Sequence, residues 1–211
     1  MDLEDVASVR IGISPVGGNA ETAFLHGRGI SANAIDGGAL ALGALPSDRA
    51  SGGRLVAGDV VVALRGATNP AAVIGEDIAA ARPCFATLDV GIVRIERADF
   101  LPDYVAAVLN LPKTQAEFAR ARTGEVTPRL PLQALAVSDI PSASFDRQRA
   151  VAGLLDEALH ERRLLSRLAA LRQTQINALL ADALHGPAED PVPGSRPARG
   201  KSARDDHAAV P

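Results

Sequence analysis

Residues 146–184 are the segment that most restricts what this chain can fold into. They contain no proline and a single glycine, Gly153, and consist mainly of strong helix formers. Asp146 is suited to cap the start of a helix, and the sequence His185-Gly186-Pro187 is a typical stop signal. Such a helix would be about 57 Å long. Because the residues before it can form only one small domain, we expect part of the helix to pair with another helix.

Apolar residues along this helix recur at steps of three and four residues, or multiples of them, as in a coiled coil. The residues of this predicted dimerisation seam are Leu154, Ala158, Leu165, Leu168, Ile176, Leu179 and Ala183. Glu161 and Arg172 interrupt the seam and would set register or antiparallel pairing. An amphipathic helix lying on its own domain fits the pattern nearly as well. We predict a dimerising helix over residues 146–185 and a disordered tail, rich in Pro, Ala, Gly and Ser, over residues 186–211.

Residues 1–141 carry the signals of a mixed α/β (α+β) domain. The clearest signal follows the turn at Gly58-Asp59, where Val60 to Leu64 form a continuous, largely β-branched run typical of a buried strand. The predicted strands are 24–30 with its turn, 55–64, 71–74, 90–95 and 134–137, with an edge at 140–141. The predicted helices run from Pro102, a favourable first-turn residue, to Leu109 and from Thr114, as a cap, to Arg122. Pro128 and Pro131 make residues 124–131 a loop.

The sequence lacks the groups that most catalytic and metal sites require. Its single cysteine, Cys84, excludes an internal disulfide and a cysteine-based zinc site. Neither Lys113 nor Lys201 suits a Ser–Lys peptidase, a class in which similar Gly-Asp-Val strands occur. The four histidines are scattered and show no metal-ligand spacing. They are His26, His160, His185 and His207. With no signal peptide or membrane-spanning run, we expect a non-catalytic cytoplasmic protein without metal or cofactor.

The charge of the chain argues mildly against a nucleic-acid partner, because the formal net charge is −3. The distribution of charge along the chain weakens this objection. Residues 1–111 hold 8 basic and 13 acidic side chains, whereas residues 112–172 hold 10 basic and 7 acidic side chains. Arginine makes up 20 of the 22 basic residues, but a GC-rich genome, whose codons favour Arg over Lys, explains this excess, so it does not indicate DNA binding.

A series of segments in a fixed order carries the strongest functional signal. A Gly-Asp strand ending in an Arg-Gly turn comes first, a strand and a Pro-x-Tyr helix follow, and a glycine loop, an Ile-Pro pair and a glutamine at the start of the long helix complete the series. They are residues 58–66, 90–95, 102–104, 124–130, 140–141 and Gln148. In this order and at this spacing they resemble one half of a type I restriction-modification specificity subunit, over about residues 55–184.

The resemblance implies a target recognition domain followed by a spacer helix. Residues 142–147 depart from the Pro-Pro-Leu and Glu that usually precede the glutamine. A full specificity subunit holds two recognition domains and two helices, whereas this chain holds one of each, so we expect a complete half-subunit. Two copies would pair through antiparallel helices and read a bipartite site. The implied partners are double-stranded DNA, an N6-adenine DNA methyltransferase subunit that binds the S-adenosylmethionine, and in some assemblies a restriction subunit.

Side chains suited to DNA lie in three predicted loops. The turn after Leu64 offers Arg65 for guanine and Asn69 for adenine, with Thr68 between them. A second group could hold backbone phosphates and comprises Arg120, Arg122, Thr123, Thr127 and Arg129. Arg28, between two glycines, is a weaker third candidate. Each group also has an interpretation without DNA. The first could be a solvated turn, and the second could be an ordinary basic surface loop. A coiled-coil adaptor whose domain binds a protein is the alternative function.

Overall fold

The computed structural model describes residues 1–16, 22–46 and 52–185. The chain divides into two compact units, Met1–Arg163 and Leu164–Pro211. The first unit mixes strands and helices, and the described part of the second unit is helical, so the predicted fold class is confirmed. The predicted tail over residues 186–211 lies outside the described residues. Among the described residues, no helix has both the length and the apolar character that crossing a membrane requires.

Four antiparallel strands form the main sheet of the first unit, in the order β1-β9-β6-β7. Their bounds are Ala7–Ile11 for β1, Val90–Ile95 for β9, Val60–Ala63 for β6 and Ala71–Val73 for β7. Val60, Val62 and Leu64 belong to one core cluster, and Val61 and Ala63 belong to another. Because successive side chains of a strand point to opposite faces, β6 is buried on both sides. The prediction of a buried strand at this run is confirmed.

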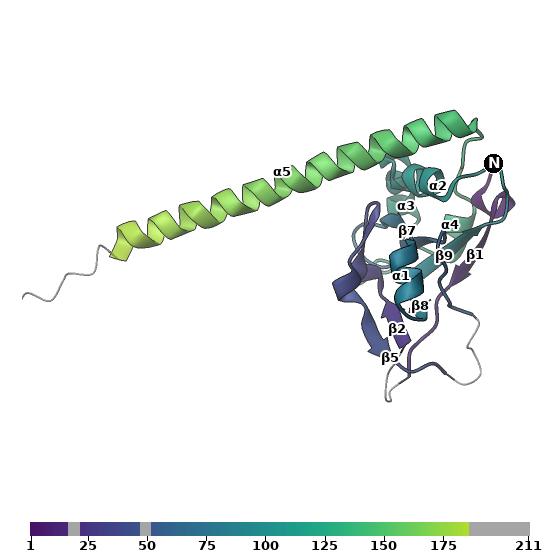
Figure 1. Cartoon of the computed structure of the whole chain (residues 1–211), viewed down its shortest axis with the longest axis horizontal. Coiled ribbons are helices and arrows are strands. Elements are labelled where there is room, and N and C mark those ends of the chain that lie inside the picture. Colours follow the sequence, from purple (N-terminus) through teal and green to yellow (C-terminus); the bar gives the residue numbers. More distant parts are fainter. Residues whose placement is uncertain (17–21, 47–51, 186–211) are drawn as a thin grey trace, which may run out of the picture. The chain divides into compact units, whose positions relative to one another are not determined.

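Helices cover one face of this sheet and a second sheet covers the other. The helices α2 (Pro102–Asn110) and α3 (Pro112–Ala121) supply Val105, Leu109 and Phe118 to the first core cluster. The second sheet has the order β5-β2-β8, with β2 antiparallel to β5 and parallel to β8. These strands are β2 (Thr22–Leu25), β5 (Ala41–Gly43) and β8 (Cys84–Ala86). Figure 1 shows α2 and the β2–β5–β8 sheet at opposite sides of the main sheet.

The remaining short elements connect these layers. A small hairpin pairs β3 (Ile30–Ser31) with β4 (Ala34–Ile35), and α1 (Glu76–Ala81) precedes β8. Three short 3₁₀ turns are η1 (Leu3–Asp5), η2 (Gly27–Gly29) and η3 (Gly37–Ala39). Strand β1, which had no clear sequence signal, adds the edge of the main sheet by pairing with β9.

Some local predictions are wrong. Residues 134–137 were expected to be a strand, but Leu132–Ala136 form the helix α4. A short apolar run is ambiguous between helix and strand, and in the structure Pro131 is the N-cap of this short helix. Helix α3 begins at Pro112 and is not capped by Thr114, whose buried hydroxyl donates to the Val108 carbonyl oxygen at 2.8 Å.

The long helix α5 runs from Phe145 to His185, one residue earlier than predicted. Asp146 therefore lies exposed in the first turn and is not the cap; its carboxylate accepts from Arg149. Within the first unit, Gln148 is buried and Val151 packs against the core. Within the second unit, every residue from Leu164 to Leu184 is exposed.

Candidate nucleic-acid interface

The turn that follows β6 is built by hydrogen bonds to the neighbouring backbone. The Asn69 side chain is buried and donates through Nδ2 to the Ala63 carbonyl oxygen at 2.8 Å. Its backbone N–H donates to Gln115 Oε1 at 3.2 Å, and Gln115 Nε2 donates back to the Asn69 carbonyl oxygen at 2.7 Å. The predicted adenine contact of Asn69 is therefore wrong, because its side chain is buried and its Nδ2 is already donated within the fold; its Oδ1 has no hydrogen-bond partner among the described residues. Arg65 and Thr68 are exposed on the same turn.

The glycine loop between Thr123 and Arg129 has a fixed base. The Thr123 N–H donates to the Arg129 carbonyl oxygen at 2.9 Å, and the Arg129 N–H donates to the Thr123 carbonyl oxygen at 2.8 Å. Gly124 has φ +92°, and a Cβ there would lie 3.1 Å from the Thr127 carbonyl oxygen. This position requires glycine for both reasons. The loop predicted over residues 124–131 is confirmed by the absence of helix or strand at these described residues.

Backbone pairing joins this loop to the turn after β6. Arg65 and Arg129 form an antiparallel bridge. The Gly66 N–H donates to the Pro128 carbonyl oxygen at 3.0 Å, and the Leu130 N–H donates to the Leu64 carbonyl oxygen at 2.8 Å. Two segments about sixty residues apart in the sequence therefore form one surface.

Arg122 holds the two segments together. Its Nη1 donates to the Gly66 carbonyl oxygen at 3.1 Å and also to the Ala67 carbonyl oxygen. The side chain is half-buried, and its Nε has no hydrogen-bond partner among the described residues. A guanidinium anchored in this way positions the turn, in contrast with the phosphate contact predicted for it.

A third segment, the turn at residues 87–89, extends the surface toward Arg28. Arg129 Nη2 lies 3.5 Å from the Leu88 carbonyl oxygen, and the Leu64 N–H donates to the Asp89 carbonyl oxygen at 2.8 Å. The Asp89 carboxylate accepts from the Gly27 N–H at 3.0 Å, which places η2 and its exposed Arg28 next to this turn. The three predicted loops are thus linked by direct contacts, and Arg120 lies in α3, before the second of them.

The side chains on this surface differ in how freely they can reach a ligand. Six predicted residues are exposed, and these are Arg28, Arg65, Thr68, Arg120, Thr123 and Thr127. Arg122 and Arg129 are half-buried. Asp89 is engaged by the Gly27 N–H and by the Thr87 hydroxyl. The exposed charge of the surface is therefore mainly cationic, although the whole chain is acidic.

His26, Thr87 and Asp89 lie together at the edge of this surface, a group that sequence patterns did not reveal. His26 Nδ1 is 3.4 Å from Thr87 Oγ1 and 4.0 Å from the Asp89 carboxylate. In a nucleophilic triad the imidazole lies between the hydroxyl and the carboxylate. The Asp89 carboxylate contacts the Thr87 hydroxyl directly, so this geometry supports the turn and does not form a proton relay. No cluster of three or more possible metal ligands occurs among the described residues.

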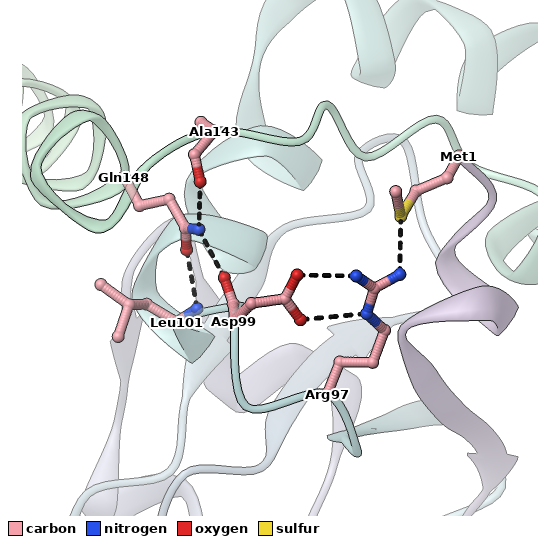
Figure 2. A network of polar contacts seen from close by, with 6 residues as sticks. All are labelled: Met1, Arg97, Asp99, Leu101, Ala143 and Gln148. Atoms are coloured by element: carbon pink, nitrogen blue, oxygen red, sulfur yellow. Dashed lines mark hydrogen bonds and ion pairs between the residues drawn. The ribbon is translucent and has the colours of Figure 1, made fainter.

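Gln148 fastens α5 to the domain (Figure 2). Its Oε1 accepts from the Leu101 N–H at 2.8 Å, and its Nε2 donates to the Asp99 and Ala143 carbonyl oxygens at 2.7 and 2.8 Å. Arg97 pairs with the Asp99 carboxylate at 2.6 Å and holds the pKa of that carboxyl below its usual value. The glutamine that introduces the helix in the sequence pattern therefore joins the start of α5 to residues 99–101.

A partly buried ion pair supports the strand that leads to the candidate surface. Asp59, from the Gly-Asp turn, is buried and accepts from Arg94 Nε and Nη2, both at 2.7 Å. Its Oδ2 also accepts from the Val56 N–H at 2.9 Å. Hydrogen bonding to Asp59 raises the pKa of the Arg94 guanidinium. The Gly-Asp motif therefore contributes to the position of β6.

Solved structures of other proteins have a similar fold. No protein-family model and no curated protein sequence matches the chain. A structure from work on complex assembly and conformational transition of the type I R-M system has a TM-score of 0.58 at 15% identity, over 85% of this chain and 42% of that chain. The HsdS subunit from Thermoanaerobacter tengcongensis has a TM-score of 0.53 at 18% identity, over 88% and 44%.

The S subunit of the type I restriction-modification system from M. genitalium has a TM-score of 0.50 at 15% identity, over 87% of this chain and 43% of that chain. At these identities the likeness establishes the fold. The chain therefore has the fold found in type I restriction-modification S subunits, and it spans less than half the length of each of these three chains.

Proposed function

We propose that this chain recognises a DNA sequence as the non-catalytic specificity half-subunit of a type I restriction-modification complex. The observation that carries the proposal is the joining of the Arg65 turn to the 123–129 loop on one rigid surface. The S-subunit fold supports the same function. In this proposal residues 1–141 form the recognition domain, and residues 146–185 form the pairing helix.

The chemistry of the surface suits DNA. Arg65 is exposed and has no side-chain partner among the described residues, so its guanidinium is free for bidentate contact with guanine or phosphate. Thr68, Thr123 and Thr127 add hydroxyls that can bond to phosphates or bases. The two segments that carry them are joined by the long-range Gly66–Pro128 and Leu130–Leu64 backbone hydrogen bonds, which reduces the conformational entropy lost on binding.

The partners follow from this function. An N6-adenine DNA methyltransferase subunit would carry the chemistry and the S-adenosylmethionine, and a restriction subunit would join in some assemblies. Such a complex would act in the cytoplasm, where it meets double-stranded DNA. The start of α5 and the adjoining face of the domain are the proposed docking region for the methyltransferase.

The exposed seam of α5 supports pairing between two copies. All seven predicted seam residues are exposed. In the second unit, the seam residues lie within an arc of about 80° around the helix, and they are Leu165, Leu168, Ile176, Leu179 and Ala183. A helix with an exposed apolar stripe gains stability by burying it against a partner. Pairing two copies would bring together two recognition surfaces for a bipartite site.

Selection of bound duplexes from a randomised pool, followed by fluorescence anisotropy across a salt series, tests DNA recognition by the full chain. We expect one bound sequence class, with affinity that falls as salt rises because phosphate contacts release counterions. Arg65→Ala combined with Arg129→Ala should weaken binding about tenfold or more. Arg162→Ala combined with Arg167→Ala removes the same charge from exposed positions of α5 and should have little effect.

Binding without sequence preference or salt dependence would contradict DNA recognition and favour the protein-binding adaptor, which the acidic residues 1–111 also suit. Pairing is tested separately by light scattering. Leu168→Glu with Ile176→Glu should convert a dimer to a monomer, whereas Ala170→Glu with Thr174→Glu, on the opposite side of the helix, should not. A monomeric wild-type chain would contradict self-pairing and leave DNA recognition to be judged by the binding assay.

A further inference from the structure

The tip of the 123–129 loop presents an apolar side chain to solvent. Val126 is 96% exposed, the highest value among the large hydrophobic residues that the structure describes. Single exposed apolar residues are common on protein surfaces and alone carry no meaning. Val126 differs because it lies on a loop whose base is fixed on both sides by backbone hydrogen bonds. The loop therefore holds an isopropyl group away from the core, where it cannot be buried by its own domain.

The charges around Val126 differ between the base and the tip of the loop. The cationic groups lie at the base of the loop, where Arg129 pairs with the backbone of Arg65. The tip carries Glu125, Val126 and Thr127, all exposed and none cationic. Glu125 has no ion-pair partner among the described residues. Because a carboxylate is repelled by phosphate, this tip is unsuited to the DNA backbone, whereas its base is suited to it.

The three side chains of the tip are of the kinds that read base edges in the major groove. A carboxylate can accept from the cytosine amino group, a hydroxyl can bond to several bases, and an apolar group can contact the methyl group of thymine. The base of the loop would then hold the flanking phosphates while the tip enters the groove. Among the three, the apolar group has one distinctive partner, since the C5 methyl of thymine is the only methyl group on the major-groove edge of the four bases.

We propose that Val126 contacts the C5 methyl group of a thymine in the recognised sequence and is a specificity-determining residue. This inference rests on the proposed DNA recognition and deepens it by naming one base and the atom that is read. Arg65 and Arg129 position the loop on the backbone, and Val126 selects thymine by burying the methyl group.

The experiment replaces thymine with uracil, which removes only this methyl group. Duplexes selected by the full chain from a randomised pool are made with each thymine in turn replaced by uracil, and binding is measured by fluorescence anisotropy. At one position the wild-type chain should bind the uracil duplex about fivefold more weakly. Val126→Ser should bind both duplexes equally, because it lacks the apolar contact. Val126→Thr keeps one methyl group and should retain part of the preference.

Val137→Ser is the matched control, because Val137 is a partly exposed valine that follows α4, outside the loop. It should keep the full wild-type preference for thymine. Equal wild-type binding to all thymine and uracil duplexes would overturn the inference while leaving DNA recognition intact, as would an unchanged thymine preference in Val126→Ser. Absence of sequence-selective DNA binding by the wild type would instead overturn the proposed function and this inference with it.

Discussion

Replacing Gln148 tests whether one buried side chain fastens the long helix to the recognition domain. Gln148 is 0% exposed, and its amide makes three hydrogen bonds to backbone groups of Leu101, Asp99 and Ala143. Gln148→Ala removes all three. At about 1 kcal/mol net for each hydrogen bond, the free energy of unfolding should fall by about 3 kcal/mol. For a folded unit of this size, that corresponds to a Tm lower by about 6–12 °C.

Gln148→Glu provides a sharper test, because the shape is kept and the donors are removed. The introduced carboxyl can accept from the Leu101 N–H, but when ionised it faces the Asp99 and Ala143 carbonyl oxygens without a proton to donate. Folding therefore favours the protonated form and raises the pKa of the introduced carboxyl above its unfolded value of about 4.3. Stability is then highest below that unfolded value and is lost as pH rises through the folded-state pKa.

Calorimetric unfolding of the full chain at pH 4, 6 and 8 measures both effects. Gln148→Glu should lie between the wild type and Gln148→Ala at pH 4, because a protonated carboxyl donates one hydrogen bond where the amide donates two, and below Gln148→Ala at pH 8. Gln133 is exposed on α4 and makes no side-chain hydrogen bond among the described residues, so Gln133→Ala and Gln133→Glu are the controls. If Gln148→Ala shifts Tm no more than Gln133→Ala, or if Gln148→Glu follows the pH dependence of its control, the reasoning is refuted.

Three further predictions concern the supports of the candidate surface. Asp59→Ala leaves the half-exposed Arg94 guanidinium unpaired and should lower the unfolding free energy by about 2 kcal/mol in denaturant titrations, below the range for fully buried pairs; a change under a few tenths would contradict a structural ion pair. Burial raises the pKa of the Cys84 thiol, so at pH 8 Ellman's reagent should react about a hundredfold more slowly with native than with unfolded chain, and equal rates would contradict the buried environment. Arg122→Ala releases the turn at Gly66 and should weaken DNA binding about tenfold without changing its salt dependence, whereas a shallower salt slope would indicate a phosphate contact.

Elements with strong local signals were predictable from the sequence. The β-branched run at residues 60–64 forms a buried strand because such side chains fill both faces of a central strand. Helix α2 begins at Pro102 because proline needs no N–H donor at that position. The same rule applies at Pro112, so α3 has Leu111 as its N-cap, three residues before the predicted cap Thr114.

The roles of the loop residues could not be predicted from the sequence. Asn69 has the sequence context of an exposed turn residue, yet it is buried because Gln115, from α3, closes over the turn. Arg122 has the context of a free surface cation, yet its guanidinium holds the carbonyl groups of a turn that is distant in sequence. In both cases a partner more than forty residues away decides the role, and local patterns contain no information about that partner.

By itself, the sequence determined the long helix, the buried central strand and the glycine loop, because each follows from backbone preferences of neighbouring residues. Only the tertiary structure decided that Arg65 and Arg129 lie on one surface, that Gln148 fastens the helix, and that Val126 stands at an exposed tip. The physical reason is that these features depend on hydrogen bonds and burial between segments far apart in the chain, which form only when the two sheets and the helices pack together.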